Sequence, residues 1–151
     1  MTGSLDVRAL RVGEHAALVE LCDAVLADFP VTTAVEHAAP EAFLADPASI
    51  VLGAYADGTP VGLAWGLQMR SPSGRRTTYL HSLDVRERWR RQRIGTALVV
   101  AAMEAAREQG STHFWLSTGG HNEGAQALYE GLGGERKPLG DVNYWWRLDD
   151  R

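Results

Sequence analysis

Apolar and polar residues alternate in some segments of the chain and recur at helical spacing in others, which predicts both strands and helices. Residues 4–11 alternate between apolar and polar types, as a half-buried strand does. Residues 13–27 instead place their apolar side chains on one face of a helix. After a loop-like stretch, Pro40 opens a short helix through Leu44. The first third of the chain therefore predicts one strand followed by two helices.

The middle of the chain predicts a three-stranded meander. Residues 49–55 and 61–69 are apolar runs separated by a segment that contains Asp57-Gly58, a strong hairpin signal. A turn with Pro72 and Gly74 follows. Residues 77–85 are then rich in β-branched and aromatic types, as strands are.

The last third returns to alternating helices and strands. Residues 95–109 form an Ala-rich helical pattern that ends before Gly110. A strand at 112–117, a helix at 122–132 and a strand at 142–148 follow. We predict an α/β (α+β) fold: one mixed sheet of six or seven strands, with helices on both faces, in a single domain over residues 1–151. The strand–helix–strand unit within 77–117 predicts a parallel pair with a right-handed crossover.

Composition narrows the class of protein. The chain has 151 residues, of which 45% are hydrophobic and 23% are charged, and its formal charge is −4. These values are typical of a soluble globular domain and disfavour disorder or a dedicated nucleic-acid binder. No long apolar run or signal peptide is recognisable, so we expect a cytoplasmic protein without a membrane partner. Cys22 is the only cysteine, which excludes an internal disulfide and a Cys-rich zinc site, and we expect no metal.

The segment between the third meander strand and the Ala-rich helix carries the clearest chemical signal. Five of the eight residues from 86 to 93 are arginine. A helix N-terminus offers unpaired N–H groups, and Gly95 allows close approach, so the segment can bind an anion such as a pyrophosphate. It matches neither a Walker A loop nor the dinucleotide motif. A solvated charged turn remains an alternative, and Trp89 is the only aromatic residue that would support RNA binding.

This segment resembles the acetyl-CoA motif of the GNAT acetyltransferases. The family pattern Arg/Gln-x-x-Gly-x-Gly/Ala, after a strand with Leu-x-Val, stands here as Arg90-Arg91-Gln92-Arg93-Ile94-Gly95. Residues 122–133 resemble the family's Asn-x-x-Ala-x-x-Leu-Tyr-x-x-x-Gly, and the inferred elements fit over residues 4–148. The Arg-rich loop and compact C-terminus are also similar to aminoglycoside 3-N-acetyltransferases. Arg93 replaces the usual Gly, and we expect it to be already helical, because a positive φ would strain an arginine.

The resemblance implies acetyl-CoA as the cofactor and CoA as a product. The backbone of residues 90–96 would hold the pyrophosphate, Asn122 the pantetheine arm, and Tyr129 would act as general acid at the sulfur. Strand amides around Leu83 and Val85 would face the thioester, which requires the fourth strand (77–85) to separate from the fifth (112–117). The residues expected at the cofactor are Leu83, Asp84, Val85, Arg90, Arg91, Gln92, Arg93, Ile94, Gly95, Thr96, Asn122, Ala125 and Tyr129.

The general base is left open. Alkylamines have a pKa of about 10, so a proton acceptor helps the attack. Many relatives carry a carboxylate directly before the Leu of Leu-x-Val, where this chain has Ser82. His81 is our candidate base, with Asp84 or water as alternatives. Strict strand alternation places His81 and Asp84 on opposite faces.

The implied activity is acetyl transfer to a primary amine of a small molecule. Alternatives are acetylation of a protein N-terminus or lysine, and a non-catalytic acyl-CoA sensor, which Arg93 and the missing carboxylate favour. Family habit also leads us to expect a homodimer. The candidate acceptor-lining residues, whose alternative is ordinary core packing, are Phe29, Glu36, His37, Trp65, His81, Trp115, Tyr144 and Trp146.

Overall fold

The computed structural model describes residues 3–31, 34–137, 144 and 146–148. The chain divides into two compact units, Met1–Gly119 and Gly120–Arg151. The first unit holds a five-stranded sheet, and the second holds helix α4 (Glu123–Gly131). No helix in the described ranges is both long and apolar enough to cross a membrane.

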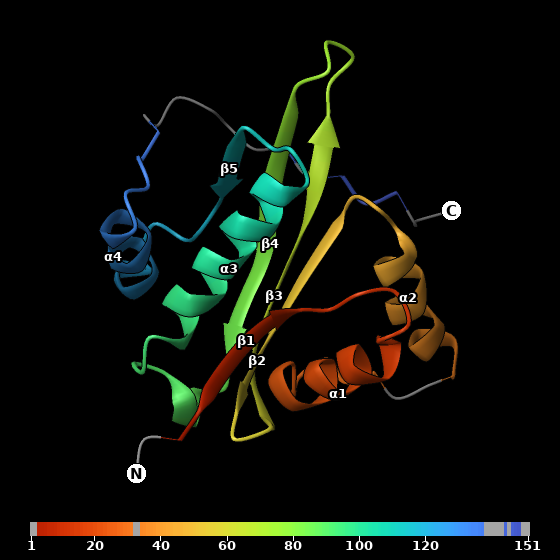
Figure 1. Ribbon diagram of the computed structural model, residues 1–151. Helices are drawn as coiled ribbons and strands as arrows, with labels where there is room; N and C mark the ends of the chain where they lie inside the picture. The colour runs from red at the N-terminus through yellow and green to blue at the C-terminus, as the bar shows by residue number, and fades with distance from the viewer. Residues whose placement is uncertain (1–2, 32–33, 138–143, 145, 149–151) are drawn as a thin grey trace. The chain divides into compact units, whose positions relative to one another are not determined.

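The sheet of the first unit runs in the order β1-β2-β3-β4-β5 (Figure 1). Each neighbouring pair from β1 through β4 is antiparallel, whereas β4 and β5 are parallel. The strands are β1 (Leu5–Ala9), β2 (Ser49–Ala56), β3 (Thr59–Arg70), β4 (Arg76–Val85) and β5 (His113–Leu116). The helices are α1 (His15–Val25), α2 (Ala34–Ala45), the short 3-10 helix η1 (Glu87–Trp89) and α3 (Ile94–Glu108).

This architecture confirms the predicted mixed α/β class, with differences in detail. The described residues form five strands rather than six or seven. Of the strand predicted at 142–148, Tyr144, Trp146, Arg147 and Leu148 lie outside any strand, and the other three positions lie outside the described residues. Helix α2 begins six residues before Pro40, which lies buried inside it rather than at its start.

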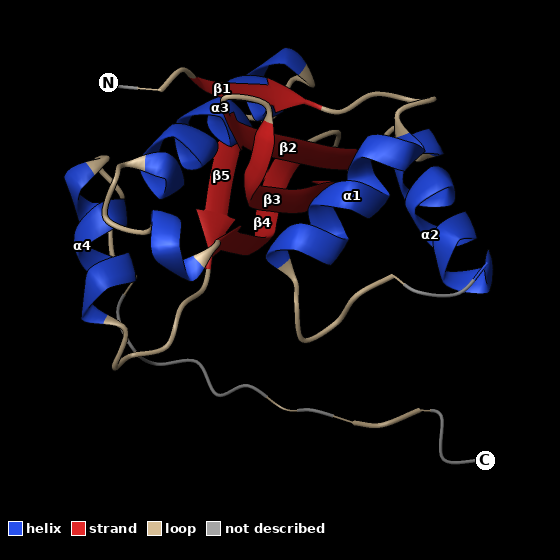
Figure 2. Ribbon diagram, turned by 90° about the horizontal axis from the view of Figure 1, so that it is seen from below, coloured by secondary structure: helices blue, strands red, loops and turns tan. Residues whose placement is uncertain are grey.

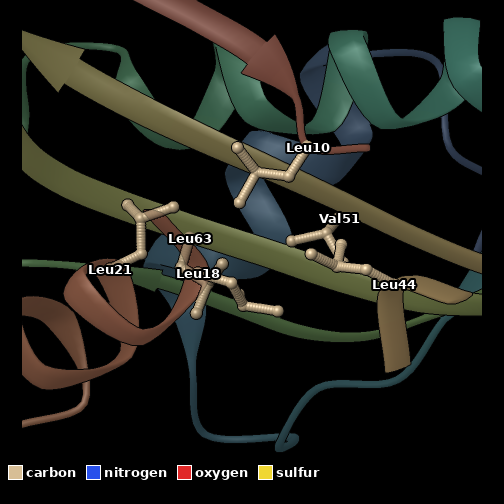
Figure 3. Close-up of a cluster of buried hydrophobic side chains, with 6 residues drawn as sticks. All are labelled: Leu10, Leu18, Leu21, Leu44, Val51 and Leu63. Carbon is tan, nitrogen blue, oxygen red and sulfur yellow. The ribbon is translucent and has the colours of Figure 1, made fainter. Parts of the chain in front are cut away.

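Helices cover both faces of the sheet, as predicted. A side chain at Gly62 of β3 would meet Ile94 and Leu98, so α3 packs on that face. On the other face α1 and α2 lie next to each other (Figure 2) and pack through a shared core cluster (Figure 3). Each fully buried leucine there contributes about 1.5–3 kcal/mol relative to an exposed one. The buried cluster is Leu10, Leu18, Leu21, Leu44, Val51 and Leu63.

An irregularity in β4 decides which way its later side chains point. Trp65 of β3 opposes Ser82, but the next residue, Gly66, opposes Leu80. His81 is therefore one extra residue, a β-bulge. A Cβ on Gly66 would lie 2.2 Å from the carbonyl oxygen of Tyr79, so this close approach requires glycine.

The bulge overturns the expectation that His81 and Asp84 lie on opposite faces. Asp84 opposes Leu63, a member of the core cluster under α1, so its side chain points to the α1–α2 face. The His81 ring contacts Trp65 and Tyr79 on that same face. Strict alternation fails here because the extra residue shifts the phase of the strand.

The ladder between β4 and β5 is short. It contains four residue pairs, from Thr77↔His113 to Leu80↔Leu116, and it ends directly before the bulge. Residues 81–85 therefore have a strand neighbour only on the β3 side. The predicted separation of the fourth and fifth strands is present as this early end of their pairing.

The Gly66 contact predicts a large local requirement for glycine. We expect Gly66→Ala to destabilise the fold by about 2–3 kcal/mol, because its Cβ meets backbone rather than a flexible side chain. Urea denaturation measures this loss. Gly131→Ala is the matched control, since a Cβ there meets nothing within 4 Å, and it should not destabilise. Equal stability of both variants would contradict the bulge geometry.

Candidate functional site

The exposed edge of β4 presents two backbone amides. The Arg86 N–H donates to the Val61 carbonyl at 2.9 Å, so the backbone N–H of Arg86 points toward β3. Antiparallel ladders alternate, so Asp84 and Ser82 also bond toward β3, and Leu83 and Val85 direct their amides away from it. The Val85 carbonyl accepts from Arg90 Nε at 3.1 Å on this outer side, consistent with the alternation.

The backbone that leads from η1 into α3 changes sign of φ at each step. Arg90 has φ −66°, Arg91 +59° and Arg93 +63°, while Gln92 is not among the positive-φ residues. Successive N–H groups in such alternating conformations form an anion-binding concavity. Arg93 is the N-cap of α3, its side chain makes no capping bond, and no acidic residue lies in the first turn of the helix. The first amides of α3, from Ile94 to Thr96, are therefore available to an anion.

The conformation of Arg93 corrects one expectation from the sequence. We expected Arg93 to be already helical, but it is left-handed, because the N-cap precedes the first helical residue. Such a conformation costs a non-glycine residue about 1–2 kcal/mol. The usual glycine of the family pattern adopts this conformation without a steric cost. The arginine bears that cost but adds a guanidinium group.

The arginines of this loop differ in what they contact. Arg86 donates to the Pro60 carbonyl at 3.3 Å, and the Arg88 guanidinium lies 5.8 Å from the centre of the Trp89 ring. Arg91 and Arg93 are exposed, and their side chains make no ion pair or hydrogen bond with the residues that the structure describes. The loop therefore offers cationic groups that remain available to a phosphate.

A row of aromatic rings crosses the α1–α2 face of the sheet. Trp65 contacts Phe43 of α2 edge-on at 5.4 Å and the His81 ring at 4.5 Å. Tyr79 contacts His81 at 5.7 Å and stacks on Trp115 of β5 at 4.2 Å. His81 is exposed, and Trp115 keeps 44% of its surface exposed, so one end of this aromatic row is open to a ligand.

A polar pair lies on the same face of β4. The Ser82 hydroxyl donates to Asp84 Oδ2. Both residues are half-buried, and Ser82 opposes Trp65 across the β3–β4 ladder. The pair therefore places one carboxylate next to the aromatic row.

The second unit carries the other expected cofactor residues on α4. Asn122 is the N-cap of this helix, and its side-chain oxygen accepts the Ala125 N–H at 3.1 Å. Its side-chain NH₂ is then the group left for a ligand. Ala125 and Tyr129 are four residues apart on α4, hence on one face, and Tyr129 is half-buried.

The remaining acceptor candidates separate into those within the aromatic row and those outside it. Trp65, His81 and Trp115 belong to the row. Phe29 is 79% exposed in the loop after α1, and the side chains of Glu36 and His37 lie outside the described residues. Tyr144 and Trp146 contact each other at 5.9 Å in the second unit. Sequence reasoning missed Phe43 and Tyr79, although Tyr79 shares the two-residue period of His81.

The only cysteine is not placed for nucleophilic chemistry. Cys22 lies half-buried on α1, where burial and the neighbouring Asp23 raise the pKa of its thiol. A thiol that resists ionisation is a poor nucleophile. This disfavours a covalent intermediate on Cys22.

Known proteins resemble this chain in sequence and in fold. Over 89 residues it is 36% identical to N-acetyltransferase 8F1 of Rattus norvegicus, covering 58% of this chain and 40% of that one. The chain thus spans about two fifths of the length of the curated relatives it matches.

Two solved structures show the same fold at low identity. An aminoglycoside acetyltransferase from an uncultured soil metagenomic sample, in complex with trehalose, has a TM-score of 0.82 at 18% identity, covering 96% of this chain and 97% of its own. Aminoglycoside N-acetyltransferase AAC(6')-Iy in complex with CoA has a TM-score of 0.76 at 17% identity, covering 98% and 97%. The model of the Acetyltransferase (GNAT) family matches residues 18–133, which include β4, the arginine-rich loop and the Asn122–Tyr129 motif. The chain therefore belongs to the GNAT acetyltransferase family.

Proposed function

We propose that this protein transfers an acetyl group from acetyl-CoA to a primary amine of a small molecule by direct attack. The observation that carries the proposal is the pairing of two features: the unpaired Leu83 and Val85 amides on β4, and the cationic, left-handed loop that leads into α3. Family membership supports the same reaction. Acetyl-CoA supplies an activated thioester whose acetyl carbon an amine can attack.

The arginine-rich loop fits the diphosphate of the coenzyme. Residues 90–96 combine amides in alternating conformations with the N-terminus of α3, and both bind anions through N–H groups. The exposed Arg91 and Arg93 guanidinium groups add charge-assisted hydrogen bonds. On β4, the outward amides of Leu83 and Val85 would bond the pantetheine arm as a missing strand would.

The α1–α2 face of the sheet fits an amine acceptor. The aromatic row binds the apolar or cationic part of a ligand, and Asp84 supplies a negative charge beside it. Two proteins that share the fold are aminoglycoside acetyltransferases, which supports a small-molecule acceptor. A cytoplasmic location and a homodimer stay predictions from the sequence.

Binding and turnover together test the proposed function. We expect calorimetry to register association of acetyl-CoA, and thiol release to rise when small primary amines are added. A panel that includes amino sugars, diamines and N-terminal and lysine peptides separates the candidates. Acceptance of peptides alone would favour a protein acetyltransferase, and binding without any turnover would favour a sensor. Absence of both would contradict the proposal.

Arg93 predicts an unusual ranking of stabilities. At this left-handed position we expect Arg93→Gly to be about 1 kcal/mol more stable than Arg93→Ala, because only alanine suffers the steric cost. Val100, 42% exposed within α3, is the control, and there alanine should exceed glycine by about 1 kcal/mol. Urea denaturation gives both differences. Both Arg93 variants should weaken acetyl-CoA binding, since each removes the guanidinium.

Tyr129 predicts a loss of rate without a loss of binding. As the general acid for the departing sulfur, Tyr129→Phe should lower kcat by about 10- to 1000-fold and leave the acetyl-CoA Kd near normal. Tyr55→Phe is the matched control, because the Tyr55 hydroxyl is buried without a hydrogen-bond partner in the first unit. Steady-state kinetics and calorimetry measure the two quantities. An unchanged kcat for Tyr129→Phe would remove the acid role.

A further inference from the structure

The half of β4 without a β5 neighbour carries a second polar feature besides its amides. Ser82 and Asp84 lie two residues apart on the α1–α2 face and are joined by a hydrogen bond in which the serine donates. Their neighbours on this face are aromatic and aliphatic: Trp65 opposes Ser82, and Leu63 opposes Asp84. The pair satisfies its own hydrogen bond, as polar groups on a partly buried face do, and it offers this face a hydroxyl next to a carboxylate.

We propose that Ser82 and Asp84 form a proton relay for the acceptor amine, with Ser82 Oγ contacting the nitrogen and Asp84 taking up the proton. This inference rests on the proposed function, because it concerns the same reaction. Ser82 is then the catalytic residue, and Asp84 is a positioning residue that acts through it.

The hydrogen bond fixes the direction of the relay. A hydroxyl has one donor and two acceptor sites. The Ser82 proton is committed to Asp84 Oδ2, so the lone pairs of Ser82 Oγ remain to accept an N–H from a ligand on the exposed side. Replacing the serine by alanine breaks this path and leaves the carboxylate in place.

The proton moves while the nitrogen attacks. A free ammonium, with a pKa of about 10, holds its proton too firmly for a carboxylate to remove it, but its N–H groups become far more acidic as the nitrogen bonds to carbon. The neutral amine therefore attacks. Its proton passes to Ser82 Oγ as the serine proton passes to Asp84, while the N–C bond forms and the thioester C–S bond breaks. The thiolate of CoA leaves and takes up a proton from water, and Asp84 returns its own proton to water.

Among the described residues, no charged group of the packed elements, Glu41 of α2 included, makes an ion pair with Asp84. On β3, Arg70 opposes Arg76 at the far end of β4, and His113 of β5 opposes Thr77 there. The charged residues of α3 are Glu104, Arg107 and Glu108, on a helix that packs on the opposite face. On α1, His15, Glu20 and Asp23 make no ion pair with Asp84 among the described residues. On β4 itself, His81 is adjacent to Ser82 in sequence, and Tyr79 contacts the His81 ring.

A pH series on two variants tests the relay. We expect Asp84→Asn and Ser82→Ala each to lower kcat by about 100-fold near pH 8 and to leave acetyl-CoA binding unchanged. The ratio of wild-type to Asp84→Asn rate should change with pH, because asparagine cannot take up a proton at any pH. Titration of the amine affects both proteins equally, so this ratio isolates Asp84. A purely structural role would give a constant ratio.

Rescue and control variants complete the design. Ser82→Glu in the Asp84→Asn background places a carboxylate at the position of Ser82, and should restore activity at least 10-fold over Asp84→Asn. Asp6→Asn, the same change on the exposed edge strand β1, should have no effect. If Asp84→Asn does not fold, Ser82→Ala measures the same path with the loss of one oxygen.

The outcomes separate this inference from the proposed function. Wild-type protein without amine-dependent CoA release would overturn the proposed function, whatever the variants do. Wild-type turnover together with full activity of Asp84→Asn and Ser82→Ala would overturn the relay alone. A pH-dependent limb that survives in Asp84→Asn and disappears in His81→Gln would assign the base to His81 instead.

Discussion

The early end of pairing between β4 and β5 is the constraint on which the rest of the site depends. A buried amide without a partner costs about 1–3 kcal/mol, so strands separate only where water or a ligand can replace the missing neighbour. Here the ladder stops after Leu80↔Leu116, and the alternation set by Arg86 turns the amides of Leu83 and Val85 outward. The pairing among β2, β3 and β4 is thereby retained, and the outer edge of β4 after Leu80 has backbone groups that can bind a polar chain.

The loop that follows β4 also offers backbone N–H groups, rather than side chains alone, to a ligand. Two left-handed arginines turn successive amides toward one side, and α3 adds its own unpaired N–H groups. The buried contacts of α3 offset the conformational cost at Arg93. Leu98 and Ala102 are fully buried, and Ile94 packs over Gly62. The packed helix holds the left-handed backbone before it in place. The backbone amides can then position an anion, and the arginine side chains add positive charge.

Much of this organisation was predictable from local sequence, and the failures have identifiable physical causes. The strand–loop–helix unit around the arginines was predictable because each boundary has a local signal, namely β-branched residues, a polar loop and an Ala-rich helix. The orientation of Asp84 was not, because a bulge depends on a cross-strand contact between Gly66 and Tyr79 that no period reveals. The expected helical conformation of Arg93 was wrong, because arginine favours a helix while this position requires the left-handed region. The aromatic row was only partly predictable, since it joins α2, β3, β4 and β5, which are distant in sequence.

The bulge at His81 also decides which substitutions in β4 affect the packing of α3 and which do not. Because of the extra residue, the aliphatic Leu83 and Val85 share the face of Gly62 and Ala64 beneath α3, and Ser82 and Asp84 share the opposite face. Substitutions at Ser82 and Asp84 therefore alter the chemistry offered to a ligand without disturbing the packing of α3. One inserted residue thus assigns ligand chemistry and helix packing to different faces of the same strand.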